Sequence, residues 1–176
     1  LYEHLIKFGA PNPQLQKPRA SKNPYDPYAI SSDATDYYNL GLICQRIGKF
    51  KEAAVEYERA TRSEHAMAQA SLAYLYETGQ GVKRDLMKAL ELYQLAAQQG
   101  HSVAQYNLGR IHQNGLKHLN QVIAPNPALA EQYLRRAAAQ GVVAAYHQLG
   151  ILYYTQGGAD KLAALTPEQL KVWDKD

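Results

Sequence analysis

The chain has 176 residues, of which 46% are hydrophobic and 20% are charged, so it is long enough and apolar enough to build a core without staples. This composition excludes a disordered tail and a fibrous protein. The net charge of +3 is too weak to indicate a nucleic-acid-binding protein, and the single cysteine excludes an intramolecular disulfide and a multi-cysteine metal site. No apolar run approaches the length of a membrane span.

We predict that residues 1–32 form an N-terminal segment and a proline-rich arm. Most of the prolines fall between residues 9 and 27, where missing amide donors and restricted preceding residues exclude a long helix. Basic residues without any acidic one lie between Lys7 and Lys22; a solvated arm is the favoured interpretation, and contact with an acidic partner or a lipid surface is the alternative. The chain starts at Leu1 and not at Met, so we expect that upstream residues have been removed, as a signal peptide or by trimming. The compartment stays open, with the bacterial periplasm favoured over the cytoplasm.

From Asp33 onward the sequence repeats itself. A leucine followed by a small residue recurs at spacings of 32, 36 and 41 residues, and paired alanines follow the first three of these pairs, at 53–54, 96–97 and 137–138. Apolar and small residues recur at helical intervals in each segment, and glycines separate the segments. We therefore predict an all-α fold over residues 33–158, an α-solenoid of stacked antiparallel helical hairpins with about seven repeat helices and no sheet. The repeated pairs are Leu40-Gly41, Leu72-Ala73, Leu108-Gly109 and Leu149-Gly150.

The small member of each pair has a predicted packing role. Antiparallel helices approach closely only where Gly or Ala replaces a bulky side chain, and a large residue then fills the neighbouring space. We expect the small residues to form these spaces. The repeated leucines, together with Tyr57, Tyr93 and Tyr133, are the predicted large residues that fill them.

One stretch carries a family resemblance. The sequence AQASLAYLYETGQGVKRDLMKALELYQLAAQQG, from Ala68 to Gly100, closely resembles a complete Sel-one-like repeat. The following copy is similar, but it has His112 where the first has Tyr76 and it carries a longer connection; the segment 37–60 is closer to the related tetratricopeptide pattern. The resemblance covers about residues 34 to 158 and implies a right-handed superhelix that acts as a protein-interaction module.

The repeat pattern is broken at two places. After the fourth copy, Thr166 as an N-cap and Pro167 at the first helical position predict a capping helix in a C-terminal segment at 159–176. Inside the third copy, the stretch GLKHLNQVIAP at 115–125 adds a loop that carries four large apolar side chains. These side chains either fold back over the adjacent helices, which we favour, or insert into a partner.

The sequence lacks the motifs of the common catalytic and nucleotide-binding sites, namely GxSxG, GxxxxGK[ST], GxGxxG and HExxH. Cys44 falls four residues after Leu40 on the same helical face, so a small buried filler is favoured over a nucleophile. His112 and His118 are six residues apart across a turn, which is not the spacing of two zinc ligands on one helix. We expect a non-enzymatic protein with no metal and no cofactor.

Tyrosine is abundant, with 14 Tyr against 2 Phe and 1 Trp. Six tyrosines occupy repeat positions that pack the hairpins together, and we assign these to the core: Tyr37, Tyr57, Tyr76, Tyr93, Tyr133 and Tyr153. Other polar and aromatic residues lie two before, two after or five after each repeated leucine, at offsets that the family resemblance places on the concave surface. Such a stripe suits a recognition groove, because rigid rings give contact area and polar tips select a partner; a plain solvated concavity is the alternative. The predicted partner-binding residues are Tyr38, Gln45, Tyr74, Glu77, Tyr106, Arg110, Gln113, His147 and Tyr154.

The leading hypothesis is a module that binds another protein through its concave face. Similar bacterial Sel-one-like proteins include immunity proteins that block a toxic lipase effector of a type VI secretion system, and a compact solenoid with an added loop suits an enzyme cleft by shape. The alternative is a bacterial envelope or secretion-pathway scaffold, for which the proline-rich arm would serve as a tether. A hydrolase that binds sugars through tyrosine is the weakest class, since no facing carboxylate pair is recognisable. We expect no nucleic-acid partner and no direct membrane span.

Overall fold

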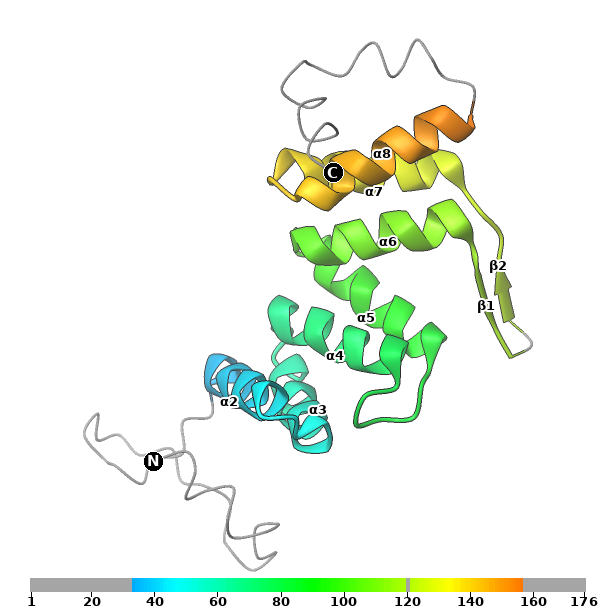
Figure 1. The fold of residues 1–176 in the computed structure, drawn as a ribbon. Coiled ribbons are helices and arrows are strands. Elements are labelled where there is room, and N and C mark those ends of the chain that lie inside the picture. The colour runs from blue at the N-terminus through cyan, green and yellow to red at the C-terminus, as the bar shows by residue number, and fades with distance from the viewer. Residues whose placement is uncertain (1–32, 120, 157–176) are drawn as a thin grey trace, which may run out of the picture.

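The computed structural model describes residues 33–119 and 121–156, and the structural statements below concern those residues. They form seven helices and one two-stranded antiparallel sheet (Figure 1). In chain order the elements are α2 (Ala34–Arg46), α3 (Phe50–Thr61), α4 (Ala66–Thr78), α5 (Leu86–Gln98), α6 (Ser102–Asn114), β1 (Leu116–His118), β2 (Gln121–Ile123), α7 (Pro127–Ala139) and α8 (Val143–Thr155).

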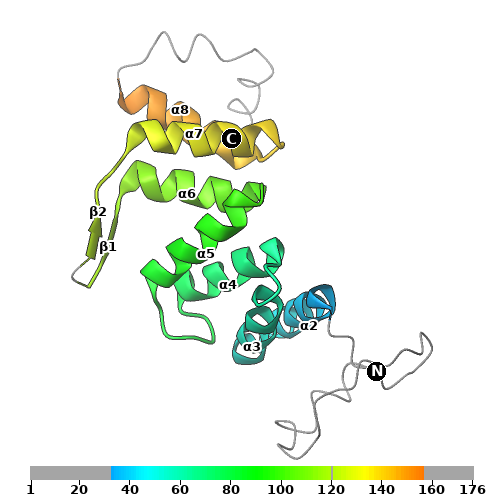
Figure 2. The same ribbon diagram turned by 180° about the vertical axis from the view of Figure 1, so that it is seen from behind.

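The helices pair as predicted, α2 with α3, α4 with α5 and α6 with α7, and α8 packs on α7 and α6. The pairs stack on one another in chain order, as both ribbon views show (Figures 1 and 2). The predicted α-solenoid of helical hairpins is therefore confirmed. The N-terminal segment and arm at 1–32 and the capping helix predicted at 159–176 lie outside the described residues. No helix in the described part is long and apolar enough to cross a bilayer.

Polar side chains set the start of most helices. Asp85 accepts hydrogen bonds from the backbone N–H of residues 87 and 88, and Asn126 accepts one from residue 129, as N-caps do. Two helices begin at histidine instead: Nδ1 of His65 accepts from the residue 68 amide at 3.2 Å, and Nδ1 of His101 accepts from the residue 104 amide at 3.2 Å. α4 ends at Gly79, whose φ of 73° is the left-handed conformation that glycine adopts most easily.

Two of the repeated glycines sit where helices approach closely. A Cβ added to Gly41 would lie 2.5 Å from the Tyr57 ring, and one added to Gly109 would lie 2.6 Å from Cγ of Leu134. Both distances are too short for any side chain without movement, so the predicted packing role of these glycines is confirmed. The large residue in the third hairpin is Leu134, however, and not the expected Tyr133. The reason is register: Leu134, like Tyr57, lies three residues before a buried alanine of the second helix.

The core consists of three clusters of buried side chains that follow one another along the stack. Of the tyrosines assigned to the core, Tyr57, Tyr93 and Tyr153 have no exposed surface. The other three are only partly buried and pack on the edges of clusters, and Tyr133 also stacks on the His112 ring with 5.8 Å between ring centroids. The repeated leucines on α4, α6 and α8 are buried.

The extra loop of the third repeat forms a β-hairpin, so the expectation of no sheet is wrong. Leu116 pairs with Ile123 across the hairpin, and both side chains pack against the cluster of α4, α5 and α6. The pairing extends to residues 118 and 121, and Leu119, which follows β1, has a positive φ of 52°. Leu119 is 90% exposed and Val122 is 65% exposed. The loop thus folds back at its base, as favoured, while its tip stays in solvent.

Candidate functional site

The candidate site is the face formed by the first helices of the repeats, α2, α4, α6 and α8, which we call the first-helix face. It carries the nine residues that the sequence predicts to bind a partner. The structure divides them into residues whose polar groups are used inside the protein and residues that point outward. Exposed members are Tyr74 and Tyr154, at 44% and 77%, together with His147. The remaining six are partly buried: Tyr38, Gln45, Glu77, Tyr106, Arg110 and Gln113.

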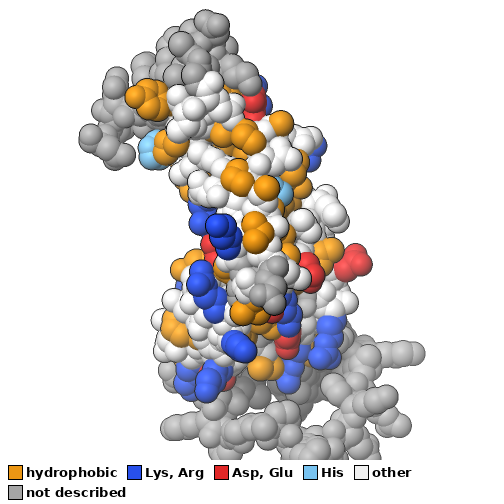
Figure 3. All heavy atoms as spheres, turned by 90° about the vertical axis from the view of Figure 1, so that its right-hand side faces the viewer, with side chains coloured by type: hydrophobic (Ala, Val, Ile, Leu, Met, Phe, Trp, Pro, Cys, Tyr) orange, Lys and Arg blue, Asp and Glu red, His pale blue; other side chains and the backbone are white. Residues whose placement is uncertain are grey.

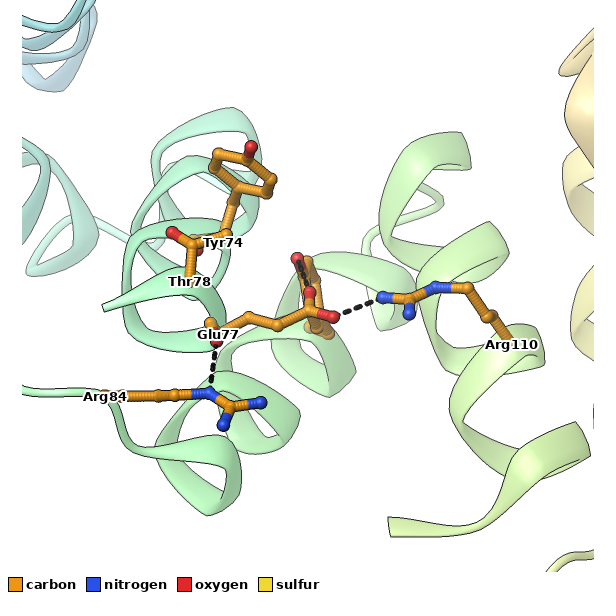
Figure 4. A network of polar contacts seen from close by, with 6 residues as sticks. Tyr74, Glu77, Thr78, Arg84 and Arg110 are labelled. Carbon is orange, nitrogen blue, oxygen red and sulfur yellow. Dashed lines mark hydrogen bonds and ion pairs between the residues drawn. The ribbon is translucent and has the colours of Figure 1, made fainter. Parts of the chain in front are cut away.

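The centre of the face is a hydrogen-bonded network around Glu77 of α4 (Figure 4). Arg110 reaches across from α6 and donates to one oxygen of the Glu77 carboxylate, and the Tyr93 hydroxyl donates to the other oxygen at 2.9 Å. Arg84 donates from Nε to the backbone carbonyl of Glu77 at 2.9 Å. The carboxylate therefore joins two first helices and the second helix between them, and Tyr74 lies one turn away on α4.

Burial and the charge of Glu77 together set the protonation states of this network. Burial, and then the negative charge of Glu77, raise the pKa of the Tyr93 hydroxyl well above its ordinary value, so the phenol remains a neutral donor. Burial by itself lowers the pKa of Arg110, but the hydrogen bond and the charge of Glu77 outweigh it, and the net shift is upward. Arg110 therefore stays cationic and Tyr93 stays protonated over the physiological pH range.

The same contact recurs in the first repeat and fails in the third. In the first repeat, the Tyr57 hydroxyl donates to Oε1 of Gln45 at 2.6 Å, and burial raises the pKa of Tyr57 to about 12. In the third repeat the corresponding pair is Leu134 and Gln113. Leucine has no hydroxyl, and Oε1 of Gln113 is a buried acceptor without a hydrogen-bond donor in the described part of the chain. Gln45, Glu77 and Gln113 thus occupy the same position in successive repeats. A tyrosine hydroxyl donates a hydrogen bond to the first two of them.

The aromatic members of the stripe differ in accessibility. Tyr38 stacks on the His65 ring, with 4.9 Å between ring centroids, and lies 5.9 Å from the Tyr57 ring. Tyr106 packs against the cluster of α7 and α8. Tyr74 and Tyr154 project their rings into solvent, so of the four aromatic residues predicted to bind a partner these two offer the most surface.

A second set of polar contacts was missed by the sequence reasoning. Gln69 of α4 accepts from Gln99 at 2.8 Å, and Gln105 of α6 accepts from Gln140 at 2.8 Å. In both contacts a glutamine on a first helix is bonded to a glutamine just beyond the end of the second helix of the same hairpin. Both Gln69 and Gln105 follow a fully buried alanine and precede the repeated leucine by three residues. That repeated Ala-Gln pair was the available signal.

The residues considered for catalysis or metal binding lie in surroundings that favour a structural role. Cys44 is 2% exposed, and burial, with smaller effects of Glu56 and Glu52, raises the pKa of its thiol, which disfavours the reactive thiolate. His112 is buried, and its pKa is lowered by burial. The described residues contain no group of three His, Cys, Asp or Glu side chains arranged to hold a metal ion.

Comparison with known proteins bears on this arrangement. The Sel1 repeat family model matches residues 66–101 and 102–142, which span α4 to α7. A putative sel1-like repeat-containing protein of Acanthamoeba polyphaga mimivirus is 31% identical in an alignment of 113 residues. The match covers 50% of this chain and 21% of that protein.

Two solved structures have a similar fold. One is a protective antigen present in uropathogenic Escherichia coli strains, which displays an SLR fold; it has a TM-score of 0.64 and 26% identity, over 70% of this chain and 27% of that one. The other is a Sel1 repeat protein from Oxalobacter formigenes, with a TM-score of 0.62 and 25% identity, over 72% of this chain and 52% of that one. The chain therefore spans about half or less of the length of each of these relatives.

Proposed function

We propose that this chain, which carries two Sel1 repeats within an α-solenoid, is a non-enzymatic module that binds another protein through its first-helix face. Sel1 repeats are protein-interaction modules, which supports the general class. The observation that carries the choice of surface is the exposed Tyr74 ring beside the Glu77–Arg110–Tyr93 network. Aromatic side chains next to fixed polar groups are the usual hot spots of protein interfaces.

Preorganisation favours this surface over a plain solvated one. Glu77 and Arg110 are held by each other and by Tyr93 before any partner arrives, so a partner that contacts Tyr74 does not have to order these side chains. Less side-chain entropy is lost on binding to such a surface. Tyr74 itself has two side-chain torsions and offers a ring and a hydroxyl, so its contact is also favourable per unit of entropy lost.

A site-specific cross-linking experiment tests the proposal. A photoreactive phenylalanine analogue replaces Tyr74 in one variant and Leu95 in the other; Leu95 lies on a second helix and is 46% exposed, which matches the 44% of Tyr74. Irradiation in extract of the source organism should capture a protein from position 74 and not from position 95. Equal capture from both positions would contradict the choice of the first-helix face.

The captured protein then allows a binding measurement. Tyr74→Ala is expected to weaken binding by roughly 1 to 3 kcal/mol, as aromatic hot spots do, and Leu95→Ala is expected to leave the affinity unchanged. Isothermal titration calorimetry with both variants provides the comparison. An unchanged Kd for Tyr74→Ala would show that the residue is not part of the interface.

The narrower form of the proposal is that the partner is a toxic bacterial enzyme, such as a lipase effector of a type VI secretion system, which this chain blocks as an immunity protein. The hairpin that projects Leu119 from one edge supports a protein that fills a cleft by shape. A bacterial envelope scaffold is the alternative. Capture of one enzyme, whose toxicity is relieved by co-expression of this chain, favours immunity, whereas capture of several envelope components favours the scaffold.

A further inference from the structure

The antiparallel hairpins place their connections at two opposite edges of the solenoid. The connections within hairpins, at residues 47–49, 79–85 and 115–126, lie at one edge, and the connections between hairpins lie at the other. At the first edge these connections adjoin one another: a Cβ on Gly81 would lie 2.3 Å from the backbone of Phe50, and the base of the β-hairpin packs on the cluster that includes Tyr76 and Met87. Figures 1 and 2 both show the hairpin running along this edge toward the α4–α5 connection. We call it the hairpin edge.

Charge is distributed unequally between the two edges. When each connection is taken with two flanking residues on either side, the hairpin edge holds six basic residues and two acidic ones. The opposite edge holds Arg62 and Glu64 only. Figure 3, which faces the hairpin edge, shows Lys and Arg side chains spread over its lower half. The six basic residues are Arg46, Lys49, Lys51, Lys83, Arg84 and Lys117.

The acidic residues at this edge are already engaged. Glu77 accepts from Arg110 and Tyr93, and the Asp85 side chain accepts from two backbone amides at the start of α5, each at 3.1 Å. In contrast, Lys51, Lys83 and Lys117 are exposed, and none of them forms an ion pair with a carboxylate in the part of the chain that the structure describes. The edge therefore presents three lysine charges that form no ion pair with a carboxylate among the described residues.

The same edge presents apolar side chains on a supported strand pair. Leu119 at 90% exposure is the most exposed large hydrophobic residue of the described part, and Val122 at 65% exposure lies on the adjacent strand. The partly buried base of the hairpin, through Leu116 and Ile123, packs on the core and supports this tip. Exposed apolar side chains that gather on one supported strand pair, with charged residues nearby, are typical of a contact surface.

We propose that the hairpin edge binds an acidic segment of a partner protein, with Leu119 and Val122 packing against an apolar side chain of that segment. The lysines along this edge supply the charge complementarity, and the apolar tip supplies the desolvated centre that interfaces require. Nucleic acid and membrane fit less well, since the basic residues are few and are separated by apolar ones, and the chain as a whole carries only +3. This surface is separate from the first-helix face and goes beyond the function proposed above.

Selection of random peptides displayed on phage against the full chain tests the proposal. We expect the enriched peptides to be acidic with at least one large apolar residue, and to bind more weakly at high salt. The triple variant Lys51→Glu, Lys83→Glu and Lys117→Glu should lose about tenfold or more of the affinity for such a peptide. Arg62→Glu, on the opposite edge, is the matched control and should lose none of it.

Two further variants separate this surface from stability and from the first-helix face. Leu119→Ser and Val122→Ser should weaken peptide binding about tenfold with an unchanged melting temperature, because both side chains are exposed. Tyr74→Ala should leave the affinity for the acidic peptide unchanged; a peptide that loses binding only in Tyr74→Ala belongs to the first-helix face. Enrichment of peptides without acidic residues, or equal loss in Arg62→Glu, would overturn the proposal. So would tighter binding to phosphatidylglycerol vesicles or single-stranded DNA than to any enriched peptide.

Discussion

Leu134 lies directly over Gly109, so that a Cβ at position 109 would come within 2.6 Å of Leu134 Cγ and 2.7 Å of its Cδ2. Both residues are buried at the contact of α6 with α7. We therefore expect Gly109→Ala to destabilise the protein by about 1 to 3 kcal/mol, and Gly109→Leu to destabilise it further, because overpacking displaces one helix from the other. Urea unfolding of the variants measures this loss.

A double variant provides the control for that prediction. In Gly109→Ala combined with Leu134→Ala, the truncated side chain makes room for the new methyl group, so the combined loss should be smaller than the sum of the two single losses. Additive losses would mean that Leu134 is not the group on which the added Cβ presses.

The unsatisfied Oε1 of Gln113 leads to a prediction about one hydrogen bond. Tyr57 occupies against Gly41 the place of Leu134 against Gly109, and its hydroxyl donates to Gln45, the counterpart of Gln113. Leu134→Tyr should supply the missing donor. We expect this variant to be more stable than Leu134→Phe by about 0.5 to 1.5 kcal/mol, the net value of one hydrogen bond.

The comparison with phenylalanine isolates the hydroxyl, because both rings occupy the same volume. Thermal unfolding of the two variants provides the measurement. Equal stability of the tyrosine and phenylalanine variants would contradict the assignment of Gln113 to the repeat position of Gln45.

Much of the fold follows from the repeated Leu-Gly and Ala-Ala pairs, since residues that allow close helix contact must recur wherever hairpins stack. The β-hairpin does not follow, because the sequence between its strands lacks the Asn-Gly signal of tight turns and Leu119 adopts a positive φ. The prediction that Tyr133 fills the space beside Gly109 is wrong by one residue, since Leu134 does so. Counting back three residues from the alanine pair, and not matching tyrosine with tyrosine, identifies Leu134.

The candidate site is predictable in position but not in accessibility. Repeat offsets from Leu72 and Leu108 place Glu77 and Arg110 on successive first helices, and they do meet. Whether a polar residue at such an offset is available to a partner depends on a side chain from the second helix. Where that side chain is a tyrosine, its hydroxyl donates to the acceptor oxygen of the polar residue. That contact joins residues 16 positions apart in the second repeat, and local periodicity does not specify it.

The histidine N-cap of α6 predicts a pH dependence of stability. Nδ1 of His101 must be unprotonated to accept the hydrogen bond from the residue 104 amide, and burial lowers its pKa below the ordinary value of 6.5. The unfolded chain therefore binds a proton at this residue more readily than the folded chain. The stability contribution of His101 is complete above about pH 6.5 and is lost as the pH falls below it.

Replacement of the capping histidine tests this dependence. His101→Asn keeps an N-cap acceptor that does not titrate, so the decrease in melting temperature from about pH 7.5 to about pH 5.5 should be smaller than in the unmodified protein. Part of the decrease should persist, because burial also lowers the pKa of His112. His101→Ala should lower the stability even at the higher pH, by about 0.5 to 2 kcal/mol. An unchanged pH dependence in His101→Asn would exclude the cap as its source.

Tyr74 and Tyr106 occupy repeat offsets on successive first helices, but the structure predicts different effects of removing them. The ring of Tyr74 is 44% exposed, so Tyr74→Ala should change the free energy of unfolding by about 0.5 kcal/mol or less. Tyr106 is partly buried against the cluster of α7 and α8, so Tyr106→Ala removes packing and should cost about 1 to 3 kcal/mol. Urea unfolding separates the two.

Because Tyr74→Ala leaves the fold intact, a loss of partner binding in that variant reports on the interface itself, whereas a loss in Tyr106→Ala combines binding with stability. Equal destabilisation by both substitutions would mean that Tyr74 is a core residue, and the proposed interface would then lack the exposed ring on which it depends.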